Sequence, residues 1–266
     1  MSEVVLPRLS QGHLNLLAAC PRKFQHAYLD RLQAPANLVQ SDRLAWGKRF
    51  HLLMQQRELG LPIASVLPED DEFGAAIAAL TESASELLST QSGTWRAAEH
   101  LRTLEFAGYL LTVVFDLLLA SRERARILDW KTYLQPPSSR RQQLVESWQT
   151  RLYLFVLAET CEYAPEQIEF VYWFVKPPAT PQQFAIAYNR EQHATTQREL
   201  TELLTNLTQW QQAYDSHGTL FPQVPESSSL CATCAFASRC QRQSPAVSEL
   251  ASDWREALAR VDEVAL

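Results

Sequence analysis

Residues Tyr109–Thr132 of the chain read YLLTVVFDLLLASRERARILDWKT. Two apolar runs flank the polar turn Ser121–Arg124, a pattern typical of two β-strands joined by a tight connection. Each run carries one aspartate, Asp116 in the first and Asp129 in the second. If the strands pair antiparallel, the two carboxylates lie close together and form a seat for Mg²⁺ or Mn²⁺. The stretch therefore predicts a strand pair that presents a metal site.

A lysine accompanies the second aspartate. Because side chains alternate along a strand, Asp129 and Lys131 share one face while Leu128 and Trp130 pack on the other. A lysine beside a metal can position or deprotonate an attacking water, or stabilise the charge that develops on phosphorus. A surface ion pair is the commoner explanation of an isolated Asp-x-Lys, so both interpretations stay open at this point.

Helical and strand patterns extend in both directions from this strand pair. Helical spacing is expected after Ser10 as far as Tyr28, with a break at Pro21, and over residues 42–59, 73–89, 142–159 and 191–214. Strands are expected over residues 104–106, 109–119, 125–132, 167–175 and 183–188. A last helix is expected after Ser244, with Pro245 at its first position.

Length and composition favour one globular domain. The chain has 266 residues, of which 46% are hydrophobic and 20% are charged. It holds 7 glycines and no GxGxxG or GxxxxGK pattern, which excludes the common kinase, NTPase and dinucleotide-binding loops. The longest uncharged apolar run, Phe106–Phe115, is too short to span a bilayer, and no basic segment precedes an apolar one at the start. We therefore expect a cytoplasmic protein without a membrane partner.

Charge is distributed unevenly along the chain. The net charge of −6 disfavours a protein that coats nucleic acid through bulk charge. Residues 20–49, however, hold six basic and two acidic side chains, and residues 121–151 hold seven and three. These segments can form a basic path on an acidic protein, although charged runs are more often solvated faces.

Five cysteines suggest a metal centre rather than a disulfide framework, because their number is odd. The spacing Cys231-x2-Cys234-x5-Cys240 allows three thiolates to share one centre. For the fourth ligand we favour Cys20, beside the expected helix break, over Cys161, which ends an amphipathic helix. Such a centre would join the N-terminal helices to the C-terminal segment. Spacing alone does not separate iron–sulfur from zinc, and a local coincidence of three thiols is the alternative.

Four further side chains are candidates for the same site as the aspartates. Gln149 and Tyr153 are four apart on an expected helix, so both can hold a phosphate or base, or orient the lysine. His51 lies in a basic helix and can complete a metal shell, and Glu105 can support the metal or its water. A solvated helix pair, a packed histidine and a solvent-facing carboxylate are the respective alternatives.

Six ordered motifs together resemble the PD-(D/E)xK nuclease superfamily. More narrowly, they look like its RecB-type branch with an iron–sulfur cysteine cluster, which includes CRISPR-associated exonucleases and the nuclease domains of AddB-type helicase-nucleases. The resemblance runs from Cys20 to Cys240, and it departs from the branch at Val113, where a glycine is common three residues before the first aspartate. The motifs are Cys20-Pro21-Arg22-Lys23-Phe24, Gly47-x-x-x-His51, Asp116, Asp129-x-Lys131-Thr132, Gln149-x-x-x-Tyr153 and Cys231-x2-Cys234-x5-Cys240.

The resemblance implies a role for each matching residue. His51, Asp116 and Asp129 become metal ligands, with the Trp130 carbonyl as a further candidate. Lys131 becomes the catalytic lysine, and Gln149 and Tyr153 become the motif associated with DNA and active-site organisation. Cys20, Cys231, Cys234 and Cys240 become ligands of a [4Fe-4S] cluster, more plausibly structural than redox-active.

The implied fold is α/β, a restriction-endonuclease-like mixed central sheet flanked by helices, with the N- and C-terminal segments joined by the cluster. It forms a single domain over residues 1–266. Its expected parts are a helical part over 1–95, a nuclease core over 96–220, the cysteine cluster over 221–245 and a C-terminal helix over 246–266.

The implied function is a Mg²⁺- or Mn²⁺-dependent deoxyribonuclease, an exonuclease on single-stranded DNA or DNA ends that leaves a 5′-phosphate. Arg22, Lys23, Lys48 and Arg49 would follow the DNA backbone. Helicase motifs are absent from the sequence, so an unwinding partner would be a separate chain. Two alternatives stay open: a non-catalytic DNA-binding or assembly subunit of a recombination, repair or CRISPR-adaptation complex, and a zinc-stapled interaction module.

Overall fold

The computed structural model describes residues 6–32, 38–63, 72–88, 93–176 and 179–242. They belong to two compact units, which we call the sheet unit (residues 1–15 and 36–209) and the cysteine unit (residues 16–35 and 210–266). The helix expected after Ser244 lies outside the described residues. The four parts expected along the chain stay a prediction, and each unit is described below by itself.

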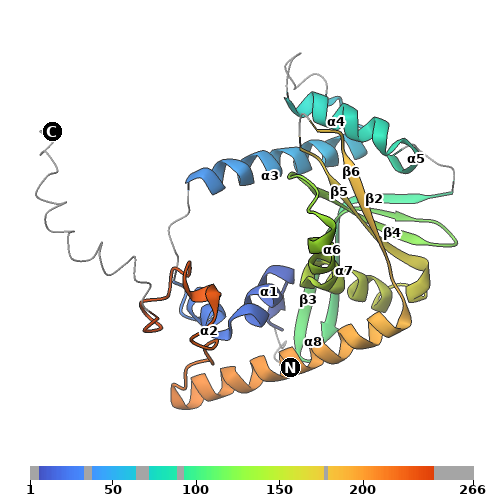
Figure 1. Ribbon diagram of the computed structural model, residues 1–266. Coiled ribbons are helices and arrows are strands. Elements are labelled where there is room, and N and C mark those ends of the chain that lie inside the picture. The colour runs from blue at the N-terminus through green and yellow to red at the C-terminus, as the bar shows by residue number, and fades with distance from the viewer. Residues whose placement is uncertain (1–5, 33–37, 64–71, 89–92, 177–178, 243–266) are drawn as a thin grey trace, which may run out of the picture. The chain divides into compact units, whose positions relative to one another are not determined.

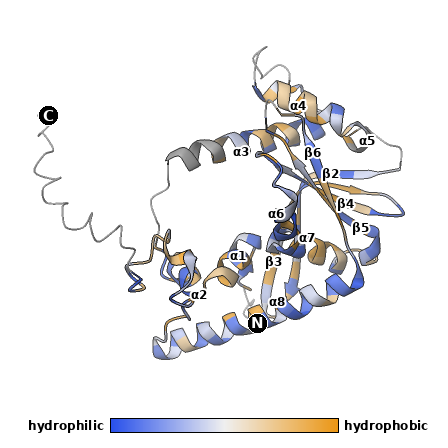
Figure 2. Cartoon of the chain, in the orientation of Figure 1, coloured by the Kyte–Doolittle hydropathy of each residue, from blue (hydrophilic) through white to orange (hydrophobic). Residues whose placement is uncertain are grey.

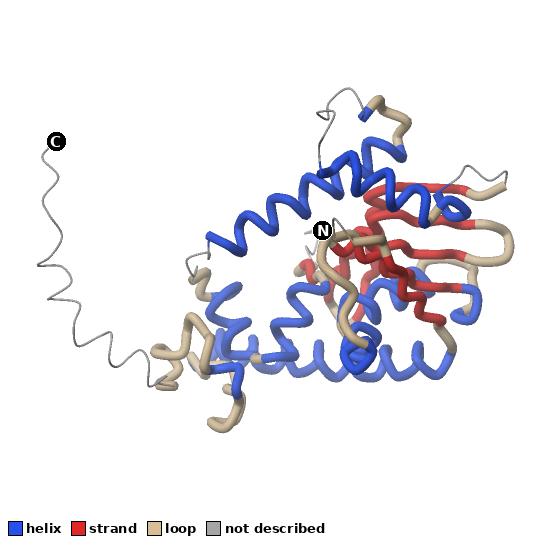
Figure 3. Tube along the Cα trace, turned by 45° about the horizontal axis from the view of Figure 1, so that its top comes forward, coloured by secondary structure: helices blue, strands red, loops and turns tan. Residues whose placement is uncertain are grey.

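One mixed sheet forms the centre of the sheet unit, as the sequence predicts (Figure 3). The strand order is β1-β3-β4-β5-β6, and β2 pairs with β3 outside this path. The β2–β3, β3–β4 and β5–β6 pairs are antiparallel, whereas β1–β3 and β4–β5 are parallel. The strands are β1 (Arg8–Leu9), β2 (Trp95–Phe106), β3 (Tyr109–Ala120), β4 (Ala125–Lys131), β5 (Ile168–Phe174) and β6 (Gln182–Ala187).

Helices cover both faces of this sheet (Figure 1). On one face lie α3 (Leu38–Glu58), α4 (Glu72–Ser83) and α5 (Ser85–Leu88), and on the other lie α6 (Ser138–Glu146) and α7 (Trp148–Glu159). The first part of α8 (Arg190–His217) belongs to the same unit. Its apolar stripe at Thr196, Leu200, Leu204 and Leu207 follows helical spacing, which is why a largely polar helix packs here (Figure 2).

The core between the sheet and α3 is apolar and closely packed. Phe50 and Met54 of α3 and Leu80 of α4 are at most 1% exposed, and Leu128 and Trp130 of β4 pack in the same cluster. Burial of such side chains stabilises the fold by about 1.5–3 kcal/mol each. Leu128 and Trp130 therefore lie on the face of β4 opposite Asp129 and Lys131, as the alternation of side chains along a strand predicts.

The sequence misplaces the start of β2. The strand begins at Trp95, nine residues before the expected Leu104. None of its side chains is fully buried, and exposed and half-buried positions alternate only from His100 onwards, so the first half of the strand lacks the alternation that marks a half-buried strand. The expected helix over residues 142–159 is also interrupted, because Ser147 is extended and caps α7 by accepting a hydrogen bond from the Thr150 N–H.

The cysteine unit joins two distant segments of the chain. The helix break expected at Pro21 is present: α1 (Gln11–Ala19) ends before Cys20, and α2 (Pro21–Phe24) and a π-helical turn (Gln25–Leu29) follow. The Arg22 Nε donates to the Phe221 carbonyl at 2.7 Å, and the Phe221 N–H donates to the Gln25 Oε1 at 2.9 Å. No described helix combines the length and apolar character needed to cross a lipid bilayer.

Candidate active site

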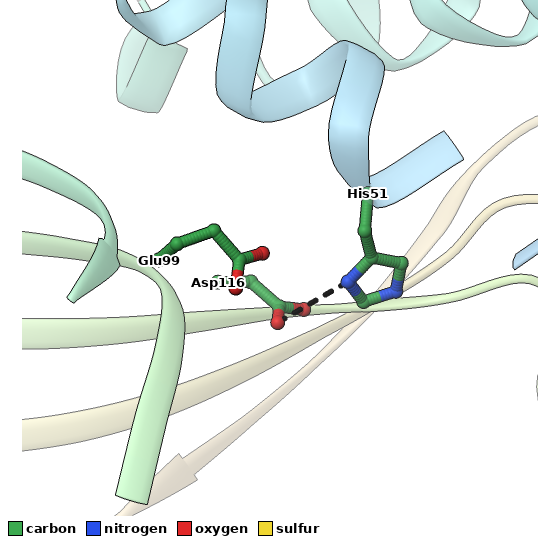
Figure 4. Close-up of side chains that lie close together, drawn as sticks. All are labelled: His51, Glu99 and Asp116. Atoms are coloured by element: carbon green, nitrogen blue, oxygen red, sulfur yellow. Dashed lines mark ion pairs between the residues drawn. The ribbon is translucent and has the colours of Figure 1, made fainter. Parts of the chain in front are cut away.

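Three side chains from three elements converge above β3 (Figure 4). His51 comes from α3, Asp116 from β3 and Glu99 from β2, and one ligand atom of each lies within 4.8 Å of the others. The His51 Nδ1 is 3.3 Å from the Asp116 Oδ1. An imidazole and two carboxylates at this spacing are a suitable ligand set for a divalent cation.

Glu99 is the member that the sequence does not reveal. The carboxylate expected to support the metal, Glu105, is exposed and lies outside the group, about 20 Å further along the same strand. Burial raises the pKa of Glu99, and the neighbouring Asp116 carboxylate raises it further. Glu99 was missed because it precedes the part of β2 in which exposed and half-buried positions alternate, which begins at His100.

The backbone is unusual where Glu99 and Asp116 face each other. Glu99 has φ +48°, a left-handed conformation that is uncommon for residues other than glycine. On β3, Phe115 contacts Tyr153 of α7, whereas Leu117 packs in the α3 core. The usual alternation of faces is therefore interrupted at Asp116. Such local strain is common at functional sites, where the surrounding structure maintains it.

Gly47 explains how α3 brings His51 to the sheet. A Cβ atom on Gly47 would lie 3.1 Å from the Thr132 Oγ1, closer than almost all real Cβ contacts. The missing side chain lets α3 approach the end of β4. One turn later, the His51 Nε2 lies 3.0 Å from the Trp130 carbonyl oxygen. The Gly47-x-x-x-His51 spacing is thus a packing requirement as well as a motif.

The two aspartates meet as antiparallel pairing requires. β3 and β4 pair with Leu117 opposite Leu128, and the Trp130 N–H donates to the Asp116 Oδ2 at 2.7 Å. Burial and the nearby Asp116 carboxylate raise the pKa of Asp129 to about 7, although Lys131 lowers it. A buried carboxyl group with a raised pKa beside another carboxylate is typical of a site built for a cation.

Lys131 and Gln149 hold Asp129 from both sides. The Lys131 Nζ lies 2.7 Å from the Asp129 Oδ2 and donates to the Gln149 Oε1 at 2.8 Å. The Gln149 Nε2 donates to the Asp129 Oδ1 at 2.5 Å. Burial lowers the pKa of Lys131, but the Asp129 carboxylate outweighs burial and the pKa is raised. The side chain is therefore an ammonium ion at neutral pH.

Tyr153 lies behind this arrangement. It is 4% exposed, and its ring packs 5.4 Å from the Phe115 ring and 6.0 Å from the Phe170 ring. Burial raises the pKa of its hydroxyl group, which interacts with Gln149. Tyr153 is thus placed to hold Gln149.

The cysteines form a second cluster, within the cysteine unit. Cys20, Cys231, Cys234 and Cys240 line one pocket of about 130 Å³, whereas Cys161 belongs to the sheet unit. Among the described residues, no three cysteine sulfurs lie within 4.8 Å of one another. Burial raises the pKa of the Cys240 thiol, Arg22 lowers it, and the three other pocket cysteines raise it.

One family model matches most of the chain. A family model described as the PD-(D/E)XK nuclease superfamily matches residues 8–241. The crystal structure of a protein from Eubacterium rectale, described as a candidate exonuclease, shares 12% identity, covers 84% of this chain and 86% of its own, and gives a TM-score of 0.50. The crystal structure of SSO0001 shares 15% identity over 92% of this chain and 89% of its own, with a TM-score of 0.38. Among curated protein sequences, none matches.

Proposed function

The chain belongs to the PD-(D/E)XK nuclease superfamily, and from this premise we propose that it is a Mg²⁺- or Mn²⁺-dependent deoxyribonuclease that acts on single-stranded DNA or DNA ends. Its proposed metal ligands are His51, Asp116, Asp129 and the Trp130 carbonyl, with Glu99 added to the set. The observation that carries the proposal is the convergence of His51 on Asp116 and on the Trp130 carbonyl.

The chemistry of the donors supports a hard divalent cation. Carboxylate, carbonyl and imidazole groups suit Mg²⁺ and Mn²⁺, whereas a thiolate-rich site would favour softer metals. Asp116 raises the pKa of Asp129, which means that the two negative charges repel each other. A cation between them would relieve this repulsion.

The reaction follows from the positions of the side chains. A bound metal ion would polarise the phosphodiester and lower the pKa of a coordinated water molecule. In the proposed hydrolysis, water would attack phosphorus and lose a proton, and the bond between phosphorus and the 3′ oxygen would break. The products would be a 5′-phosphate and a 3′-hydroxyl group, which takes up a proton. The Lys131 ammonium can stabilise the negative charge that develops on the phosphoryl oxygens. Gln149 contacts both Lys131 and Asp129 and keeps their separation constant.

Exposed side chains of the sheet unit support a single-stranded substrate. Lys48 and Arg49 are exposed on α3 next to His51, where they can contact phosphates. Tyr133 and Leu134 lie two and three residues after Lys131 and are 47% and 63% exposed. An exposed aromatic ring beside the reaction centre can stack on an unpaired base.

We further propose that the four pocket cysteines bind a [4Fe-4S] cluster, with Cys20 rather than Cys161 as the fourth ligand. Their common pocket supports this, and thiolates are the ligands of iron–sulfur clusters and of structural zinc alike. A cytoplasmic location fits cysteines that stay reduced. Iron, sulfide and zinc contents of anaerobically purified protein distinguish the two metals.

A nuclease assay tests the main proposal. With Mg²⁺ or Mn²⁺, the wild-type protein should degrade labelled single-stranded DNA. Asp116→Asn and Lys131→Met should each reduce the rate by about 10²–10³-fold or more, because each removes a charge at the reaction centre. Asp215→Asn, an exposed carboxylate on α8, is the matched control and should behave as wild type. Wild-type protein that binds DNA without cleaving it under either metal would favour the assembly-subunit alternative.

A further inference from the structure

A histidine that the sequence motifs do not include lies against the cysteine cluster. His26, in the π-helical turn of the cysteine unit, is 6% exposed, and its Nε2 is 3.8 Å from the Cys240 sulfur. Its ring packs 5.3 Å from the Phe236 ring. His26 does not line the cysteine pocket, so it contacts Cys240 from outside.

Asp30 fixes the orientation of this histidine. The His26 Nδ1 lies 2.8 Å from the Asp30 Oδ2, and the Tyr214 hydroxyl donates to the Asp30 Oδ1 at 2.9 Å. Burial raises the pKa of Asp30, but the hydrogen bonds from His26, Tyr214 and Gln25 outweigh burial and lower it. An ionised carboxylate only accepts hydrogen bonds, so the His26 Nδ1 carries a proton. The ring is thereby held with its Nε2 directed at Cys240.

We propose that His26, oriented by Asp30, is a positioning residue that hydrogen-bonds the Cys240 sulfur and stabilises the metal centre of the four cysteines. The proposal rests on the metal centre proposed above and assigns it a partner within the protein. A metal-bound cysteine sulfur accepts hydrogen bonds, and the His26 Nε2 is placed to donate one to Cys240.

Two physical consequences follow from such a hydrogen bond. Groups that orient metal ligands from outside typically change metal affinity by about 10–100-fold when they are mutated. Hydrogen bonds to the sulfurs also set the reduction potential of an iron–sulfur cluster, because they withdraw electron density from the thiolates. Without the bond, the cluster should be lost faster and should be harder to reduce.

Two substitutions of His26 separate hydrogen bonding from packing. His26→Phe keeps an aromatic ring against Phe236 but removes the donor, whereas His26→Gln places an amide N–H near the position of the Nε2. The matched control is His217→Phe, which changes an exposed histidine of the same unit. Each variant of the full chain is purified anaerobically and analysed for iron, sulfide and zinc. The loss of cluster absorbance in excess chelator and the reduction potential are then measured.

The expected result is an assembled cluster in every variant. In His26→Phe the cluster should be lost about tenfold faster or more, with a more negative potential. In His26→Gln, the rate of cluster loss and the reduction potential should both return most of the way to the wild-type values. His217→Phe should match wild type in both measurements. Asp30→Asn should fall between wild type and His26→Phe, because it removes the group that orients the ring.

Three outcomes contradict the proposal. An unchanged loss rate and potential in His26→Phe would show that the contact does not matter. Absence of iron from His26→Phe, as expected for Cys234→Ala, would make His26 a ligand or a folding residue instead. A wild-type protein without any metal would overturn both the cluster and the role of His26. If the wild type holds zinc, only the cluster assignment fails, and zinc transfer to the chelator tests His26 with the same variants.

Discussion

In the candidate active site without a metal ion, burial and the nearby Asp116 carboxylate disfavour the negative charge of Asp129. The side chain is buried next to Asp116, and its pKa is raised to about 7. An ordinary aspartate has a pKa near 4, so the folded state holds a proton over about three pH units in which the unfolded chain releases it. The contribution of this carboxyl group to stability is therefore present below pH 4 and is lost as the pH rises through 7.

Metal binding should reverse this loss and release protons. Two of the proposed ligands compete with protons: the Asp129 carboxyl group, whose pKa is raised to about 7, and the His51 imidazole, whose pKa burial lowers but the Asp116 carboxylate raises more. Because both must be deprotonated to bind a metal ion, the apparent Mg²⁺ or Mn²⁺ affinity should rise by more than about tenfold per pH unit around pH 6 and level off at higher pH. Calorimetric titrations at pH 6 and pH 8, in two buffers with different ionisation enthalpies, measure the number of protons released. We expect more than one proton at pH 6, because both Asp129 and His51 lose a proton, and clearly fewer at pH 8. Equal release at both values would contradict metal binding by these two residues.

At the scale of secondary structure elements, the distance between α3 and β4 determines whether His51 reaches the site. A Cβ on Gly47 would lie 3.1 Å from the Thr132 Oγ1, so the two elements are in contact at the glycine. The contact is one helical turn from His51, whose Nε2 forms a hydrogen bond with the Trp130 carbonyl oxygen. A small outward shift of α3 would therefore move one metal ligand away from the others.

Gly47→Ala should thus weaken metal binding without unfolding the protein. Alanine favours a helix by about 0.5–1 kcal/mol relative to glycine, which offsets part of the strain. We expect a metal affinity reduced by about tenfold, measured by calorimetry, and a thermal midpoint within a few degrees of wild type. Thr132→Ala removes the opposing oxygen, so the double variant should regain affinity, and a double-mutant cycle quantifies this coupling. Gly12→Ala, whose Cβ would meet only an ordinary 3.8 Å contact, is the control and should not change metal binding.

Hydrophobic patterns in the sequence predicted the strands that bury apolar side chains, and they missed the part of β2 that buries none. β3 and β4 combine apolar alternation with a polar turn, and their antiparallel pairing brings Asp116 beside the Asp129–Trp130 backbone as expected. β2 buries no side chain fully, so neither its true start nor Glu99 carries a hydrophobic signal. The left-handed backbone at Glu99 lies where the β2–β3 register has no paired residue, between Ala98 and His100, and no local sequence pattern marks it.

At the scale of the whole molecule, long-range contacts were the hardest to predict. Spacing motifs predicted that Cys20 joins a cysteine cluster far along the chain; the four cysteines line one pocket, and the cluster itself stays a prediction. His26 and Asp30 carry no such motif, because their importance depends on which side of Cys240 the folded segment presents. The motifs that could be found are those whose residues are close in sequence.

The choice between Cys20 and Cys161 determines how the chain is held together. A cluster that includes Cys20 bonds it to Cys231, 211 positions away, and closing a loop of that length restricts the unfolded chain by about 5 kcal/mol. This is comparable with the total stability of many domains, which is about 5–15 kcal/mol. Cys161 belongs to the sheet unit and is not among the residues that line the cysteine pocket.

Cys20→Ser should therefore lose iron and sulfide, and the segment 210–242 should become sensitive to protease. Cys161→Ser is the matched control, and it should keep its iron and its resistance to protease. Iron per chain and the proteolysis pattern are measured side by side, and chelator-treated wild type should reproduce the Cys20→Ser pattern because it lacks the same bonds. Iron loss in Cys161→Ser with retention in Cys20→Ser would reverse the ligand assignment.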